Sequence, residues 1–270
     1  MLFNYRMAKT QKELAFLRDL YIDDLWTRRF TDLVDKHLKF AKETNFLYIN
    51  AGTGGHAFAL REKISDKTAV FATCENDDIL TIARDKAAAV KADIDFSRLA
   101  FDDDVFDVVL ADASLVPPAE LTEFIQNAIR VTRVGGRVAI FTVSAGSFGE
   151  IFSLLWEVLF NEDLGEHGAA AEKMIAEQPT VSRIEETAQA AGLSNVEAHT
   201  ASEIFEYENG AEFIGSPLVE DFLLPAWLAT LSEKENEQVT KKLAQLIDAE
   251  DGTLTFRFTV KATLLIGEKT

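Results

Sequence analysis

Short apolar runs alternate with amphipathic stretches over the first 145 residues of the chain. The run at 106–112 is apolar on both faces, which is typical of a central parallel strand. The stretches between the runs carry apolar residues at helical spacing. Strands are therefore predicted at 46–49, 68–75, 93–97, 106–112 and 135–144, the last entered through a glycine turn, with helices from about 56, at 77–90 and at 119–132. This alternation predicts an α/β protein with a doubly wound, mostly parallel sheet.

The two ends of the chain follow other patterns. Residues 10–43 have the spacing of one or two helices, and 147–160, 181–191 and 232–250 are further helical stretches. The chain closes on a long alternating segment with Leu254, Phe256, Phe258 and Val260 on one face, which predicts an antiparallel last strand near the sheet edge. We divide the chain into an N-terminal helical arm, 1–40, and one domain, 41–270, with helical cap insertions near 145–180 and 207–230.

Charge is unevenly distributed along the chain. The 45 acidic and 27 basic side chains give a net charge of −18, which disfavours DNA or RNA as a partner. Residues 1–42 nevertheless hold nine basic and six acidic side chains, a net of +3, so the remainder carries −21. This excess is explained either by a solvated helical face or by an arm that closes over an acidic body.

Several protein classes are disfavoured by composition. Cys74 is the one cysteine, so neither an internal disulfide nor a cysteine-based zinc site is expected. No run of eighteen apolar residues suggests a membrane span, and the N-terminal segment lacks the pattern of a secretion signal. We therefore expect a cytoplasmic protein with no membrane partner and no metal.

The stretch NFLYINAGTGG joins the first predicted strand to a helix through a glycine-rich turn. Gly52 and Gly54 would let a ligand approach the backbone closely, at the strand ends where doubly wound sheets bind ligands. The series from Gly52 to Ala57 also fits the dinucleotide fingerprint G-x-G-x-x-G/A, with Glu75 about twenty residues further on. The turn alone leaves both kinds of cofactor open.

Four segments together resemble the class I S-adenosylmethionine-dependent methyltransferases, close to the type 11 group: FLYINAGTGG, ILTIARDKA, LAFDDDVFDVVLADASL and FIQNAIRVTRVGGRVAIFT. The resemblance implies a Rossmann-like methyltransferase fold and S-adenosyl-L-methionine as cofactor. Tyr48 stands where that family usually has an acid and Asn50 where it has glycine, although Asn adopts left-handed backbone readily. The ribose acid is expected at Glu75, one residue after its usual place. The implied cofactor-binding residues are Tyr48, Asn50, Ala51, Gly52, Thr53, Gly54, Glu75, Asn76, Asp95, Phe96, Ser97, Asp112 and Ala113.

Methyl transfer from a sulfonium depends mainly on positioning, although a neutral acceptor also needs a base. Asp112 and His167 are the candidate catalytic residues, and His56 is expected to contact the cofactor edge or cap a helix. The acceptor is expected to be a small or apolar molecule, and a homodimer is possible. Two alternatives stay open: a methyltransferase-like module without catalysis, and an NAD(P)-dependent oxidoreductase.

The predicted arm and cap are unusually rich in large apolar side chains. Exposed apolar patches are costly or functional, so segments 1–30, 145–180 and 207–230 are predicted to pack over the carboxyl ends of the fourth and fifth strands. They would form an apolar acceptor pocket near Asp112 and Ser114. The alternative is a structural extension of the core or a dimer interface. The residues concerned are Trp26, Phe152, Trp156, Phe213, Phe222 and Trp227.

Overall fold

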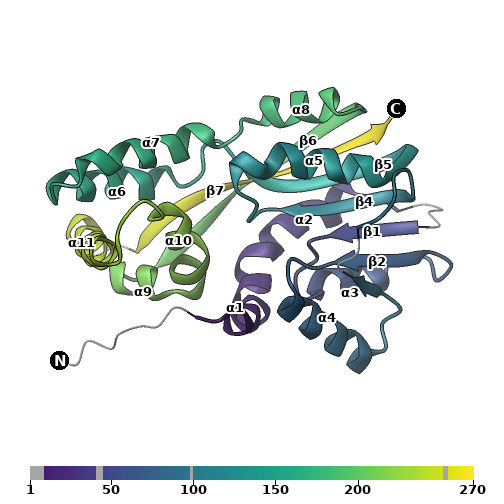
Figure 1. Ribbon diagram of the computed structural model, residues 1–270, viewed down its shortest axis with the longest axis horizontal. Coiled ribbons are helices and arrows are strands. Elements are labelled where there is room, and N and C mark those ends of the chain that lie inside the picture. Colours follow the sequence, from purple (N-terminus) through teal and green to yellow (C-terminus); the bar gives the residue numbers. More distant parts are fainter. Residues whose placement is uncertain (1–8, 41–44, 98–99, 252–254) are drawn as a thin grey trace.

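The protein is built on one seven-stranded sheet, seen in a computed structural model that describes residues 9–40, 45–97, 100–251 and 255–270 (Figure 1). The strand order is β3-β2-β1-β4-β5-β7-β6. The pairs among β1 to β5 are parallel, whereas β7 runs antiparallel to both β5 and β6. The predicted doubly wound sheet with an antiparallel last strand is therefore confirmed. The strands are β1 Asn45–Ile49, β2 Ala69–Thr73, β3 Asp95–Ser97, β4 Phe106–Ala113, β5 Thr132–Ser144, β6 Leu193–Tyr207 and β7 Phe256–Lys269.

Alternate residues of the central strands bury two separate cores. In β1, Phe46 and Tyr48 face one core, and Leu47 and Ile49 face the other. Helices α5 (Leu121–Val131) and α8 (Val181–Ala190) cover the second face. The first face is covered by α2 (Arg28–His37), α3 (Gly55–Arg61) and α4 (Asp77–Val90). Burial on both faces explains why the β4 segment reads as a continuous apolar run.

The N-terminal arm is a continuous helical path. It begins with α1 (Gln11–Leu17), continues as the π-helix η1 (Arg18–Thr27) and ends in α2. Thr10 and Glu13 form a reciprocal capping box that fixes the start of α1. Figure 1 shows this arm, in purple, beside α4 and below the central strands.

Strands β6 and β7 extend beyond the end of β5. The β5–β7 pairing ends at Ser144 and Lys261, but the β6–β7 ladder continues to Tyr207 and Phe256. This extension supports a layer of helices at the carboxyl end of the sheet (Figure 1). The layer comprises α6 (Gly149–Asn161), η3 (Gly165–His167), α7 (Gly168–Glu177), α9 (Gly210–Gly215), η4 (Leu218–Leu223), α10 (Leu224–Trp227) and α11 (Glu233–Asp251); the short η2 (Pro118–Glu120) precedes α5.

Two strand boundaries differ from the predicted ones. The glycine turn expected before the fifth strand is a bulge inside β5, because Phe106 pairs with Thr132 while Val108 pairs with Arg137. Gly135 has φ of 70°, which explains the glycine there. In β7, Phe256, Phe258 and Val260 are buried as predicted, whereas Leu254 lies outside the described residues.

Candidate functional site

The glycine-rich turn after β1 has the left-handed backbone that its sequence predicts. Asn50, Gly52 and Gly54 have φ of 55°, 57° and 89°. The Ala51 amide donates to the Thr73 carbonyl at 2.8 Å, and the Gly54 amide donates to the Ala51 carbonyl at 3.1 Å. These bonds tie the turn to the end of β2 and lead directly into α3. Asn50 therefore replaces a glycine without loss of the turn geometry.

Glycine at position 54 is required by close packing. A Cβ there would lie 2.8 Å from the Phe96 ring and 2.9 Å from the Phe58 ring, closer than real Cβ contacts. Phe96 is buried at the end of β3 and forms an edge-to-face pair with Phe58. Phe96, which was predicted to contact the cofactor, thus packs its ring against the glycine turn at Gly54.

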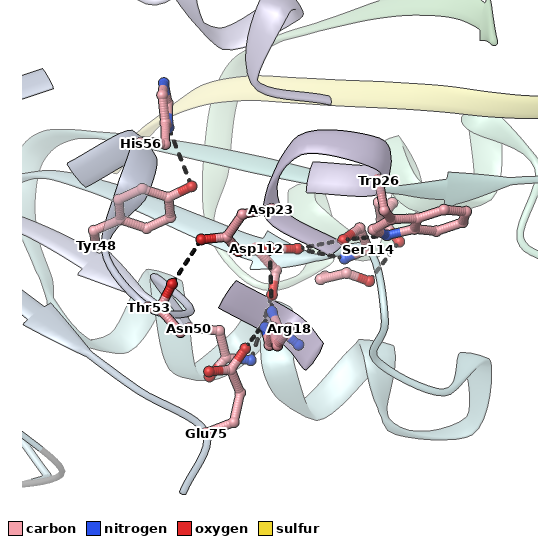
Figure 2. Close-up of polar contacts among 12 residues, drawn as sticks. Arg18, Asp23, Trp26, Tyr48, Asn50, Thr53, His56, Glu75, Asp112 and Ser114 are labelled. Atoms are coloured by element: carbon pink, nitrogen blue, oxygen red, sulfur yellow. Dashed lines mark hydrogen bonds and ion pairs between the residues drawn. The ribbon is translucent and has the colours of Figure 1, made fainter. Parts of the chain in front are cut away.

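Glu75 lies just after β2 and Asp112 lies near the end of β4, the two strands that flank β1. Both are joined to Arg18 of η1, whose Nη2 lies 2.5 Å from Glu75 Oε1 and 3.9 Å from Asp112 Oδ2 (Figure 2). The Arg18 side chain is only 7% exposed. Glu75 therefore points toward the strand ends, as its assignment to the ribose requires, and its present partner is a guanidinium from the protein itself.

The arm also reaches the glycine turn. Thr53 is fully buried, and its Oγ1 lies 2.5 Å from Asp19 Oδ1 and 2.7 Å from Asp23 Oδ2, so its single proton is donated to one of these carboxylates at a time. Lys86 Nζ of α4 pairs with Asp19 at 2.5 Å. Burial raises the pKa of the Asp23 carboxyl, although its bond to Thr53 opposes that effect. We call this set the strand-end cluster: Arg18, Asp19, Asp23, Thr53, Glu75 and Asp112.

A second chain of polar contacts starts at the end of β4. Asp112 Oδ1 accepts hydrogen bonds from the Ser114 amide at 2.8 Å and from Ser114 Oγ at 2.6 Å. Trp26 Nε1 of η1 donates to the same Ser114 Oγ at 3.0 Å (Figure 2). Burial raises the pKa of Asp112 to about 6, against the opposing effects of Arg18 and Ser114. Asp112 is therefore a stronger proton acceptor than an ordinary carboxylate, and Ser114 is its hydrogen-bond donor.

An apolar cavity of about 260 Å³ adjoins this chain. Ser114 and Trp26 form part of its wall, and Thr142 and Val143 bring in the end of β5. Phe148 turns into the cavity from a left-handed backbone position with φ of 62°, which is strained for a residue with a side chain. The remaining wall residues are Leu115, Val116, Pro117, Pro118, Leu121, Phe152, Met174, Glu177, Gln178, Pro179, Phe222, Leu223, Ala226 and Trp227.

Of the two residues predicted beside an apolar pocket, Ser114 lines the cavity and Asp112 does not, and two of the aromatic residues also differ from the prediction. Trp26, Phe152, Phe222 and Trp227 line it as expected. Trp156 does not, because it is 45% exposed on the outer face of α6 and stacks on Phe160. Phe213 is fully buried and packs on Tyr207, Phe256 and Phe258, so its role is to extend the core.

Several predicted site residues have other partners in the structure. The Tyr48 hydroxyl lies 3.2 Å from His56 Nδ1, so these two side chains contact each other on the α3 side of β1. Asn76 caps α4 by accepting from the Ile79 amide at 2.9 Å. Asp95 is exposed, and Ser97 is buried. His167 lies 3.3 Å from Thr230 Oγ1 and is not part of the cavity wall, so nothing in the geometry links it to Asp112.

The residues that sequence analysis missed all belong to the arm. Arg18, Asp19 and Asp23 contact the predicted site although they lie outside every recognised motif. The net positive charge of residues 1–42 was the available signal. Lys9 also pairs with Asp221 at 2.5 Å, and Arg29 pairs with Glu203 at 3.1 Å. The interpretation of a basic arm closing over an acidic body therefore agrees with the ion pairs that Lys9, Arg18 and Arg29 form.

Other features do not suggest a competing site. A hollow of about 450 Å³ between α5 and α8 contains none of the strand-end cluster residues. Within the described part of the chain, no group of three or more His, Cys, Asp or Glu side chains is arranged to hold a metal. None of the helices in the described ranges is both long and apolar enough to cross a membrane.

Residues 7–203 match the model of the ubiE/COQ5 methyltransferase family. The chain belongs to this family. The match spans the arm, the glycine turn and the first five strands, and it confirms the resemblance to class I S-adenosylmethionine-dependent methyltransferases. It also decides between the two interpretations of the glycine turn, in favour of S-adenosylmethionine and against a nicotinamide cofactor. No curated protein matches this methyltransferase in sequence.

Solved structures share the fold of this methyltransferase at low sequence identity. The YcgJ protein from Bacillus subtilis is 15% identical, with a TM-score of 0.58 over 90% of this chain and 98% of that one. A phosphoethanolamine N-methyltransferase 2 from Haemonchus contortus, in complex with phosphomonomethylethanolamine and S-adenosylhomocysteine, is 14% identical. Its TM-score is 0.55 over 96% of this chain and 58% of that one. At such identities the likeness extends to the fold alone.

Proposed function

We propose that this methyltransferase transfers a methyl group to a small acceptor with an apolar body and one hydroxyl or amine group. The observation that supports this most strongly is the position of Ser114. Ser114 lines the apolar cavity, and its Oγ donates at 2.6 Å to Asp112, a member of the strand-end cluster. One residue thus connects the space suited to an acceptor with the strand ends suited to the cofactor.

The chain's own residues fit the cofactor chemically. The turn from Asn50 to Gly54 allows close approach of the cofactor's amino acid end, and Glu75 would accept from the ribose hydroxyls. One Glu75 oxygen, Oε2, is buried without a hydrogen-bond partner, so the carboxylate has acceptor capacity left. When bound, S-adenosylmethionine supplies an electrophilic methyl group on a sulfonium.

The proton of the acceptor leaves through Ser114. An acceptor heteroatom that takes the methyl group, as the bond from that group to the cofactor's sulfur breaks, would pass its proton to Ser114 Oγ, and Ser114 would pass its own proton to Asp112. Trp26 fixes this path because its indole N–H donates to Ser114 Oγ and leaves the serine hydrogen directed at Asp112. A carboxyl with a pKa of about 6 is ionised at neutral pH and still accepts a proton readily.

Blocking the cavity mouth tests the acceptor assignment. Ala226 is exposed and lines the cavity, so Ala226→Trp should obstruct the acceptor without loss of folding. Ala229→Trp is the matched control, because Ala229 is exposed in the same segment but is not in the cavity wall. Transfer of labelled methyl from S-adenosylmethionine would be measured over a panel of small phenols, alcohols and amines.

We expect Ala226→Trp to abolish transfer and to leave S-adenosylhomocysteine binding intact, while Ala229→Trp leaves both intact. Asp112→Asn should slow transfer by on the order of 100-fold, the lower end of a general-base contribution. Equal transfer by the wild type, Ala226→Trp and Ala229→Trp would contradict the assignment. Thermal stabilisation by S-adenosylhomocysteine, and not by NAD, tests the cofactor separately.

A further inference from the structure

The arm fills the space in front of the glycine turn. A Cβ added at Gly52 would lie 3.3 Å from Arg18 Nε and 3.3 Å from an Asp23 carboxylate oxygen. At Gly55 the same Asp23 carboxylate would lie 3.3 Å away. Glycine lets other groups come close to the backbone of this turn. Side chains of η1 occupy that space, which the cofactor would need.

Arg18 is buried among carboxylates and is incompletely paired. Its guanidinium contacts Glu75 and Asp112, and Asp23 adds to the negative potential that raises the Arg18 pKa despite burial. Yet Arg18 Nε and Glu75 Oε2 are both buried without a hydrogen-bond partner. Unpaired buried polar atoms are rare in native structures and call for an explanation. Here they indicate a pair that matches in charge but not in hydrogen-bonding geometry.

We propose that Arg18 is an internal competitor of the cofactor: its guanidinium occupies the acidic cradle of Glu75 and Asp112, and η1 withdraws when a cationic cofactor takes its place. The inference rests on the proposed cofactor site and adds a residue that controls its affinity. A sulfonium and an ammonium group restore the positive charge that Arg18 removes. The vicinal hydroxyls of a ribose supply two donors to Glu75, including one for the oxygen that Arg18 leaves unpaired.

The energetics allow such an exchange. Buried ion pairs contribute little net stability because desolvation offsets their attraction, so the cluster holds η1 in a specific position without strong binding. The segment is also a π-helix over ten residues, a form that is rare and concentrated at functional sites. Ile22 and Trp26 lie further along η1 and anchor it by their burial. The end of η1 at Arg18 is polar, and it is the end that the cofactor would displace.

The competitor should lower the apparent affinity for substrate and product by the same factor, the population of the closed state. S-adenosylmethionine carries a positive sulfur, whereas the sulfur of S-adenosylhomocysteine is neutral. The carboxylates of the cradle therefore favour the substrate, and Arg18 returns more easily against the product. Removing the guanidinium should therefore raise the affinity for both compounds by a similar factor and leave S-adenosylmethionine the tighter ligand.

Calorimetric titration of the full chain with S-adenosylhomocysteine and S-adenosylmethionine tests the proposal. Arg18→Met keeps much of the side-chain length and removes the charge. Arg29→Gln is the matched control. Arg29 belongs to the same arm, but its partner is Glu203 of β6, which is not part of the strand-end cluster. We expect Arg18→Met to bind S-adenosylhomocysteine at least about fivefold more tightly than the wild type, since a competing closed state lowers apparent affinity by its population. Arg29→Gln should bind like the wild type.

Hydrogen exchange on the wild-type protein gives a second test that needs no variant. Saturating S-adenosylhomocysteine should protect the amides at 50–55 and accelerate exchange at 18–23. Weaker binding in Arg18→Met would show that Arg18 is a cofactor ligand and would overturn the proposal. Equal binding in wild type and variant, with unchanged exchange at 18–23, would overturn it while leaving the cofactor site intact. If neither folded protein binds either compound, the cofactor site itself is refuted and the competitor with it.

Discussion

The helix η1 joins two regions of opposite character. At one end Arg18 enters the strand-end cluster, where carboxylates and a guanidinium fill the space beside the glycine turn. At the other end Trp26 enters a wall of aromatic and aliphatic side chains around a cavity of about 260 Å³. The polar region is thus filled by the protein, and the apolar region keeps open volume. One helix can therefore couple the cofactor side of the site to the acceptor side.

The two regions should contribute differently to stability and to binding. Apolar packing stabilises in proportion to the area removed from water, so the aromatic wall should hold the helical layer in place. Buried charges give little net stability, but leaving one of them unpaired is costly. Substitutions in the apolar region should therefore act on folding, and substitutions in the polar region should act on binding or on pH dependence unless they leave a charge unpaired.

The largest effect is expected in the apolar region. Phe152 is fully buried and contacts Trp227 and Phe148, so Phe152→Ala should lower the free energy of unfolding by about 3–5 kcal/mol through lost burial and a new void. Trp156→Ala is the control, one turn along the same helix but exposed, and should cost under about 0.5 kcal/mol. Urea unfolding measures both. Similar losses for the two variants would remove the distinction between a packed wall and an outer face.

The next effect tests the polar region. Glu75→Ala leaves the buried Arg18 guanidinium without its nearest carboxylate, which should cost about 3 kcal/mol of unfolding free energy. Adding Arg18→Met to Glu75→Ala should recover most of that loss, because the unpaired charge is then gone. A double variant as unstable as Glu75→Ala would show that the loss comes from packing and not from charge. Cys74→Ala, at the neighbouring position, should not reproduce the effect of an unpaired charge.

A pH dependence of stability should distinguish Asp112 from surface carboxylates. Burial raises its pKa to about 6 in the folded protein, above the ordinary value of 3.8. The folded state thus holds the proton more tightly, so the contribution of Asp112 to stability is full below pH 4 and is lost as pH rises through 6. We expect the wild type to lose about 2 kcal/mol relative to Asp112→Asn between pH 4 and pH 7.5. Parallel pH profiles of the two proteins would show that Asp112 is not perturbed in this way.

The smallest effect tests the contact between the two regions. Trp26 Nε1 donates to Ser114 Oγ inside the cavity wall, a bond worth about 1 kcal/mol between neutral groups. The double-mutant cycle of Trp26→Phe and Ser114→Ala separates this bond from the packing lost with the indole. A coupling energy near 1 kcal/mol is expected. A value near zero would mean that the contact does not hold Ser114 in place.

The sequence predicted the apolar region better than the polar one. Strands such as β4 are apolar on both faces, and Trp26, Phe152, Phe222 and Trp227 belong to stretches too apolar to be surface loops. Hydrophobic burial is set largely by residue type, so pattern alone locates these side chains. The failure at Trp156 has the same origin, because periodicity does not distinguish the outer face of an apolar helix from its inner face.

The polar region depends on contacts between distant segments. Glu75 was predicted from its place after β2, and Asn50 from its tolerance of left-handed backbone. Arg18 and Asp23 could not be predicted, because nothing local distinguishes them from other charged residues of an amphipathic arm. The role of these residues arises only when the arm docks against the glycine turn. Asp19 and Asp23, which both contact Thr53, lie 34 and 30 residues before it in the sequence. The excess of basic residues in the arm indicated the docking but not the residue.

A crystal structure of the full chain with S-adenosylhomocysteine would show whether the cofactor displaces Arg18. We expect the compound beside the turn from Asn50 to Gly54, with its ribose hydroxyls on Glu75 and with Arg18 withdrawn from Glu75 and Asp112. The apolar cavity should remain next to Ser114 and open toward the bound sulfur. Binding of the compound elsewhere, with the contact between Arg18 and Glu75 unchanged, would contradict the account.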